Sequence, residues 1–222
     1  MGLWNLDNIN ARRDATIGKA AIFYAPLWDT ETELDMDFLG FTEGEVSVAF
    51  NDEEQALTLP EYTGSLAHEK RIQGPGPIVT IPIFTGSPAL RAVLSPTGTA
   101  SGGTGRQIRP VEYTLAIFPE DLFLDVATGQ TQLELSYDGT AWELAGQALT
   151  TEQARLLGQS LWIWRGHFTR PDMTYRFEEV GKSVDETTFV AMYYDLMPNG
   201  HRAHTIGDPT TQGIDVFNGL GS

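Results

Sequence analysis

Two histidines and an aspartate near the C-terminal end come closest to the pattern of a metal site. His201 and His204 stand three residues apart, and Asp208 follows. Glycine and proline flank them, which predicts a loop, whereas the paired ligands of H-E-x-x-H enzymes lie on one face of a helix. We therefore interpret both histidines as loop residues that contact backbone or solvent, and we predict no metal ion.

Other catalytic patterns are incomplete. Residues 98–106 are rich in glycine but lack the Gly-Lys-Ser/Thr ending of a phosphate-binding loop. No G-x-S-x-G elbow occurs, and the absence of cysteine excludes thiolate nucleophiles, disulfides and cysteine zinc sites. Residues 29–37 are acidic but lack the glycine and the closing glutamate of an EF-hand loop. The chain is therefore predicted not to be an enzyme and to carry no cofactor.

The tryptophans offer one further chemistry, which is stacking on sugar rings. Trp162 and Trp164 stand two residues apart on a predicted strand, so both would point to one side of it. Packing in a core or an interface is the favoured interpretation, because aromatic rings dominate both. A carbohydrate-binding β-sandwich stays as an alternative that a secretion signal would favour, and the N-terminus shows no apolar run behind a basic start.

The elements that position these residues are mainly strands. Apolar or alternating runs predict strands at 19–28, 38–50, 54–62, 78–84, 111–118, 160–168, 174–180 and 184–194, with 65–72 as strand or turn. Because proline has no N–H group to donate to a neighbouring strand, Pro82 predicts that its strand lies at a sheet edge or contains a bulge. Short helices are predicted at 88–94 and at 118–129, the second ending at Gly129.

Two local signals are more specific. Thr150 and Gln153 have capping-box spacing, which predicts a helix that continues through Ala154, Leu157 and Leu161. The dipeptide Asp138-Gly139 separates the alternating stretches 133–137 and 140–144, which is typical of a β-hairpin with a two-residue type I′ turn. That hairpin would carry one apolar face, formed by Leu133, Leu135, Tyr137, Trp142 and Leu144.

Together these elements predict a mainly β (α+β) chain: an antiparallel β-sandwich or partly closed barrel with a flanking helix and extended loops. Residues 1–17 are expected to form an N-terminal arm, with Leu3, Trp4, Leu6 and Ile9 as possible anchors on a partner. A single domain is expected over 18–194, with long loops near 51–77 and 95–110 and a C-terminal extension at 195–222. No run of about 18 to 20 apolar residues predicts a membrane span.

The charge is strongly and unevenly acidic. The net charge is −16, and the stretch 20–69 holds 12 acidic residues without one lysine or arginine. A protein that grips nucleic acid neutralises phosphates with basic side chains, so this composition argues against such binding. It is compatible with solubility alone, or with a surface past which a polyanion slides without sticking. Acidic faces with a few basic points suit head-to-tail stacking of unlike surfaces.

Three stretches carry a resemblance to a known family. They are GKAAIFYAP with LGFTEGEVSVAF, then RGHFTRPDMTYRFEEVGKSVDETTFVAM, and finally GHRAHTIGDP. In their order and character they resemble the major tail tube proteins of long-tailed bacteriophages, which are related to the tube proteins of type VI secretion. The resemblance extends over roughly residues 18 to 210.

The resemblance implies a structural virion protein located in the phage tail after folding in the host cytoplasm. Six copies would form a ring, and rings would stack into a hollow tube. Genome DNA, often preceded by a tape-measure protein, would pass through the lumen without specific binding. One sheet of each subunit would join its neighbours around the lumen. A hairpin would reach between subunits, formed by 51–77 or by 95–110.

From charge and position we expect two groups of functional residues. Candidate lumen-lining residues lie in an acid cluster beside alternating strands: Glu43, Glu45, Asp52, Glu53 and Glu54. Candidate inter-subunit contacts are Trp4, Leu6, Arg106 and Arg109. The alternative within the virion is a tail terminator, a distal tail protein or a capsid decoration protein, none of which polymerises into open-ended stacks.

Overall fold

The computed structural model describes residues 19–42, 44–49, 53–56, 70–73, 76–84, 111–124, 129–169, 184–198 and 200–219. Within these ranges the chain is mainly β, with one α-helix, which confirms the predicted fold class. The largest sheet is antiparallel and has the strand order β2-β1-β7-β11-β12-β6-β3, with β13 paired to β11. Its strands are β1 (Ala20–Pro26), β2 (Asp37–Phe41), β3 (Ser47–Ala49), β6 (Ile78–Phe84), β7 (Tyr113–Pro119), β11 (Leu161–Thr169), β12 (Val184–Ala191) and β13 (Thr205–Ile206).

Smaller elements flank this sheet. A three-stranded sheet has the order β10-β9-β8, and β4 pairs with β5 in a two-stranded sheet of its own. The bounds of these elements are β4 (Glu53–Ala56), β5 (Lys70–Gln73), η1 (Glu120–Phe123), β8 (Leu135–Tyr137), β9 (Trp142–Leu144), β10 (Gln147–Ala148), α3 (Thr151–Leu157) and η2 (Pro209–Gln212).

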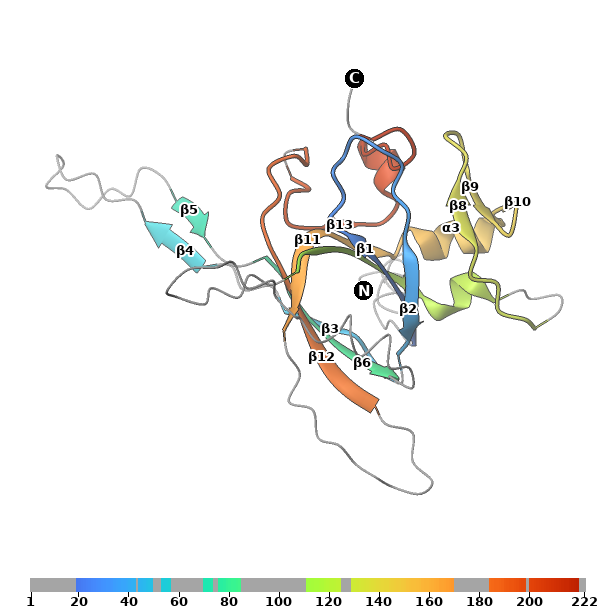
Figure 1. Ribbon diagram of the computed structural model, residues 1–222, viewed down its shortest axis with the longest axis horizontal. Helices are drawn as coiled ribbons and strands as arrows, with labels where there is room; N and C mark the ends of the chain where they lie inside the picture. Colours follow the sequence, from blue (N-terminus) through green and yellow to red (C-terminus); the bar gives the residue numbers. More distant parts are fainter. Residues whose placement is uncertain are drawn as a thin grey trace, which may run out of the picture.

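The large sheet is strongly curved, and its connectivity shows why. β2 and β3 lie at opposite ends of the strand order, yet they follow one another in the chain. The connection from Phe41 to Ser47 spans about 21 Å at full extension, whereas seven flat strands would put their edges about 29 Å apart. The sheet must therefore curl so that its two edges approach, as Figure 1 shows. Because β2 and β3 are not hydrogen-bonded to each other, the curled sheet stays open at this point.

The sheet is apolar on both faces in its β1–β7–β11 half. Consecutive residues of these strands point to opposite faces and belong to two separate clusters, as Ile22 and Phe23 do. The inner cluster also contains Val79 and Phe189 from the other half of the sheet, so it fills the concave side. Its buried members are Ala20, Ile22, Leu39, Val79, Ile81, Leu115, Ile117, Leu161, Ile163, Phe168, Phe189 and Ala191.

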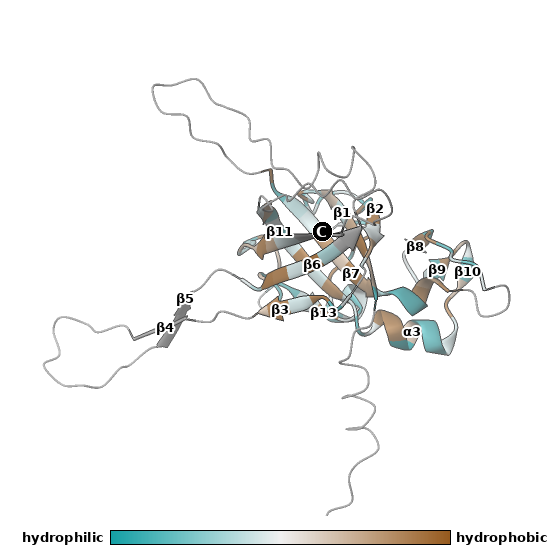
Figure 2. Ribbon diagram, turned by 90° about the horizontal axis from the view of Figure 1, so that it is seen from below, coloured by the Kyte–Doolittle hydropathy of each residue, from teal (hydrophilic) through white to brown (hydrophobic). Residues whose placement is uncertain are grey.

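The outer cluster occupies the convex side of the same half. There Phe23, Phe118 and Trp162 pack beneath η1, α3, the β8–β9 hairpin and the C-terminal residues 194–216. Figure 2 shows the helix and this hairpin beside one flank of the sheet. Each such side chain contributes about 1.5–3 kcal/mol when it is fully buried. Burial on both faces explains why these strands read as nearly continuous apolar runs.

The predicted hairpin is correct, but its predicted turn is wrong. Tyr137 pairs with Trp142, so the loop has four residues, 138–141, instead of two. The Asp138 carboxylate accepts hydrogen bonds from the backbone N–H groups of Thr140 and Ala141, both at 2.7 Å. These two bonds stabilise the longer loop. The apolar face is as predicted, because all five side chains named for it belong to or pack on the outer cluster.

The capping box is confirmed, but the helix is shorter than predicted. Thr150 accepts from the N–H of Gln153, and the Gln153 side chain accepts from the N–H of Thr150. The helix ends at Leu157 with Gly158 as its C-cap, and Leu161 is instead the first residue of β11. Of the three residues predicted to continue the helix, Ala154 is exposed.

One strand prediction and one helix prediction need correction, whereas the edge position predicted for Pro82 agrees with the strand pairing. The predicted strand 38–50 is interrupted at Thr42, whose backbone N–H donates to the Ala20 carbonyl at the last position of the β1–β2 ladder. β6 pairs with β12 along its whole length and with β3 only over residues 78–80, so Pro82 lies where one side has no described strand. The predicted helix at 118–129 is a single 3₁₀ turn that ends at Phe123.

The remaining predictions of strands and helices either agree with the structure or concern residues outside the described ranges. The weak strands expected at 54–62 and 65–72 are represented by the short β4 and β5. The helix at 88–94 and the strand at 174–180 lie outside the described residues, and the described partners of β12 are β11 and β6.

Candidate assembly surfaces

The β4–β5 hairpin is one candidate surface for association. Its ladder runs from the pair Glu53 and Gln73 to the pair Ala56 and Lys70. It is hydrogen-bonded to no other described strand, and Figure 1 shows it to one side of the curved sheet. A lone two-stranded hairpin is only marginally stable in water. Of the two ranges predicted for an inter-subunit hairpin, 51–77 contains this ladder, and 95–110 lies outside the described residues.

The outer face of the β11–β12–β6–β3 half is a second candidate surface. The strand register aligns four hydroxyl side chains in one row across the strands: Thr169, Thr188, Thr80 and Ser47. Ser47 is exposed and the three threonines are half-buried, while the Thr169 hydroxyl donates to the Thr188 carbonyl at 3.0 Å. The neighbouring row consists of His167, Val190, Ile78 and Ala49. We call these two rows the hydroxyl face.

The sequence prediction missed the hydroxyl face, although a local signal exists. In the run IVTIPIF, Val79 and Ile81 alternate with Ile78, Thr80 and Pro82, which puts the polar hydroxyl and the proline on the same face. The alternation gives the face of each strand, but only the register brings residues from four strands into one row.

The five predicted lumen residues do not all lie among the described residues, and those that do belong to different segments. Glu45 is exposed and lies two residues before β3, at the margin of the hydroxyl face. Glu53 and Glu54 are the first residues of β4, where the backbone pairs them with Gln73 and Ile72. The description does not include Glu43 and Asp52.

The predicted inter-subunit contacts are not placed by the structure. Trp4, Leu6, Arg106 and Arg109 all lie outside the described residues, so their predicted role stays a prediction.

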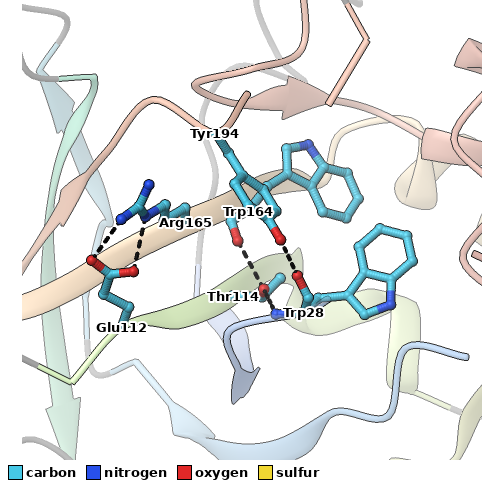
Figure 3. A network of polar contacts seen from close by, with 6 residues as sticks. All are labelled: Trp28, Glu112, Thr114, Trp164, Arg165 and Tyr194. Atoms are coloured by element: carbon cyan, nitrogen blue, oxygen red, sulfur yellow. Dashed lines mark hydrogen bonds and ion pairs between the residues drawn. The ribbon is translucent and has the colours of Figure 1, made fainter. Parts of the chain in front are cut away.

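A polar network fixes the bend in β11 that connects the two halves of the sheet (Figure 3). The ladder between β11 and β7 shifts register between Ile163 and Gly166. The Thr114 hydroxyl accepts from the Trp28 N–H at 3.1 Å and donates to the Trp164 carbonyl at 2.8 Å. These bonds join the end of β1, the start of β7 and the middle of β11.

Two further contacts complete this network. The Tyr194 hydroxyl donates to the Trp28 carbonyl, and burial raises the pKa of this tyrosine. The Arg165 guanidinium donates two hydrogen bonds of 2.9 Å to the Glu112 carboxylate, which raises the pKa of the arginine. Planar, two-pronged pairs of this kind constrain direction as well as distance. The network therefore fixes the orientation of the strands that carry the hydroxyl face relative to the other half of the sheet.

Gly166 lets β12 approach β11 at the bend. A Cβ atom at this position would lie 2.3 Å from the Phe189 ring and 2.6 Å from the Val190 carbonyl oxygen. Both distances are far below van der Waals contact, so any larger residue here forces the strands apart. No local pattern in the sequence indicates this requirement, because Phe189 and Val190 of the neighbouring strand lie more than twenty residues further along the chain.

The residues that were weighed and rejected as metal or sugar ligands have structural contacts. Asp208 caps η2 by accepting from the Thr210 N–H at 2.9 Å, and it also accepts from the Trp142 indole at 2.9 Å. The His201 ring lies 3.2 Å from the Thr205 hydroxyl. Within the described ranges, no three histidine, aspartate or glutamate side chains gather as possible metal ligands.

The paired tryptophans belong to the core, as predicted. Trp162 and Trp164 are 2% and 0% exposed, and their rings stack with centroids 5.6 Å apart. Their indole N–H groups donate to the Ser160 and Thr205 hydroxyls. Both rings are therefore almost entirely covered by neighbouring side chains, unlike rings that stack on a sugar at the surface.

No described helix is both long enough and apolar enough to cross a lipid bilayer. Comparison of the chain with protein-family models, curated proteins and solved structures found no match.

Proposed function

We propose that this protein is a structural subunit of a bacteriophage tail tube. Six copies form a ring, and rings stack into a hollow tube that delivers genome DNA. The β4–β5 hairpin carries the proposal, because its ladder has no third strand within the described chain. Such a hairpin gains stability when it pairs with or packs on another copy.

The hydroxyl face supports the same assignment. It is formed by the strands next to the open edge β3, and apart from His167 none of its eight residues can carry a charge. Copies can pack or pair along such a surface without burying a charge, which would be costly. The edge strands are only five and three residues long, which suits a defined neighbour rather than open-ended aggregation.

The acidic residues have a consistent role in this assembly. Glu45 is exposed beside the hydroxyl face, and Glu53 and Glu54 belong to the hairpin. Together with Glu43 and Asp52 they are our candidates for the lumen wall, where negative charge prevents DNA from sticking. The tube subunit acts by assembly and is not an enzyme, its partners are further copies and a tape-measure protein, and its location is the virion tail.

Electron microscopy at rising protein concentration tests the proposal, with light scattering as the parallel measure of mass. We expect hollow tubes or stacked six-fold rings. Gln55→Pro fixes the backbone of β4 in its middle and removes a backbone N–H group that could pair within the hairpin or with another copy, so it should reduce assembly. Gln55→Ala keeps the N–H group and serves as the matched control that assembles like the wild type.

Two outcomes would overturn the assignment. Closed trimers or other oligomers that never stack would favour a decoration or terminator protein. A monomer at every concentration, also under crowding by polyethylene glycol, would exclude self-assembly as the main activity.

A further inference from the structure

A cleft on the convex side of the sheet combines an aromatic floor with an acidic rim. Its volume is about 300 Å³, and it lies between residues 33–36, the β8–β9 hairpin and the C-terminal residues Val216 and Phe217. The floor consists of aromatic rings from the sheet and the hairpin: Phe23, Phe118, Trp162, Tyr137 and Trp142. Glu33, Asp35 and Glu134 are exposed lining residues, and among the described residues no lysine or arginine lines the space. We call this space the acid-rimmed cleft.

The walls of the acid-rimmed cleft are held in place by hydrogen bonds. The Leu34 N–H donates to the Val216 carbonyl at 2.8 Å, which joins the acidic loop to the C-terminal segment. The Trp142 indole donates to Asp208 at 2.9 Å, and the Tyr137 ring contacts Trp142 with centroids 5.2 Å apart. A site with fixed walls loses little entropy when a ligand enters it. The arrangement is typical of a binding site for a peptide that is apolar at one point and basic at another.

The chain contains a segment with this chemistry. Residues 1–17 carry Trp4 among other apolar residues, followed by the adjacent Arg12 and Arg13. The stretch that includes Glu33 and Asp35 holds no lysine or arginine at all, so the charges of segment and rim are complementary. A tryptophan with nearby arginines is also the kind of anchor that dominates protein interfaces.

We propose that the acid-rimmed cleft binds the N-terminal arm, residues 1–17, of a second copy of this chain. Trp4 packs on the aromatic floor, and Arg12 and Arg13 lie opposite Glu33 and Asp35. The arm and the cleft are unlike surfaces, so each copy can donate one arm and accept another. Such a head-to-tail contact can repeat from copy to copy, and it stays open-ended when the rotation between copies does not close a ring. The choice of a second copy rests on the proposed tube assembly, which needs an open-ended contact of this kind.

Cysteine cross-linking tests the contact directly, because the wild-type chain contains no cysteine. Full-length Asn5→Cys is mixed with full-length Ser136→Cys, whose exposed side chain lines the cleft. Under mild oxidation we expect a disulfide between the two variants. Thr211→Cys is exposed and does not line the cleft, so its mixture with Asn5→Cys should give at least about tenfold less product.

Charge reversal separates docking between copies from docking within one chain. The arm variant is Arg12→Glu/Arg13→Glu, and the rim variant is Glu33→Lys/Asp35→Lys. Each reversal alone should weaken association by about tenfold, which corresponds to two exposed ion pairs. A mixture of the two variants should restore it, since each arm then meets a rim of opposite charge. Asp121→Lys/Asp195→Lys reverses two exposed acids away from the cleft and should change association little.

The outcomes distinguish this inference from the proposed function. Tubes without the Asn5–Ser136 cross-link would overturn the docking and leave the tube assignment standing. Cross-linked chains that never form tubes would support the docking and overturn the tube assignment. A disulfide that forms only within one chain carrying both cysteines would mean that the arm folds back on its own copy, and our inference would be wrong. Circular dichroism of every variant checks that a lost cross-link does not reflect unfolding.

Discussion

Gly166→Ala is the substitution for which the structure gives the clearest magnitude. The new Cβ would lie 2.3 Å from the Phe189 ring and 2.6 Å from the Val190 carbonyl oxygen. Phe189 is fully buried and packs on Phe168 with ring centroids 4.8 Å apart, so the ring cannot swing away. The carbonyl is backbone in the β11–β12 ladder. Relief therefore requires a strand shift of about 1 Å at a site where overpacking costs about 1–3 kcal/mol.

We expect the upper part of that range, reduced slightly because alanine restricts the unfolded chain by about 0.4–1 kcal/mol. The net loss should be about 2 kcal/mol, which lowers the melting temperature by roughly 4–8 °C for a domain of this size. Urea unfolding followed by circular dichroism measures it. Gly44→Ala is the control, because its Cβ would make only ordinary contact, 3.7 Å from Pro82. If Gly166→Ala is as stable as this control, the close approach of β12 at the bend is incorrect.

Two further predictions concern the polar network at the same bend. Glu112→Gln leaves the Arg165 guanidinium with a neutral partner and should cost about 1.5 kcal/mol, the lower end for hydrogen bonds to charged groups. Urea midpoints should show a smaller difference from wild type at high salt, and an unchanged difference would mean that charge is not the cause. Burial raises the pKa of Tyr194, so the folded state favours the protonated phenol. Its contribution to stability is complete below the ordinary tyrosine pKa of about 10 and is lost as pH rises through the higher folded-state value. Tyr194→Phe should therefore show a shallower alkaline decline in thermal stability, while an identical decline would exclude a role for this phenol.

The sequence by itself determined the strands of the core. β1, β7 and β11 were predictable because apolar residues on both faces produce a local signal that needs no knowledge of neighbours. The cap at Thr150 was predictable for the same reason, since both of its hydrogen bonds join residues three apart. The location of the β8–β9 hairpin also followed from alternation around a turn.

Only the tertiary structure decided how these elements meet. The four-residue loop, the open edge between β2 and β3 and the requirement for Gly166 depend on hydrogen bonds or contacts that local periodicity does not encode. The hydroxyl face and the acid-rimmed cleft arise in the same way, because register and packing unite residues from distant parts of the chain. A strand pattern reports which face of the strand is buried, but it carries no information on which strand lies beside it, because every backbone offers the same hydrogen-bonding groups.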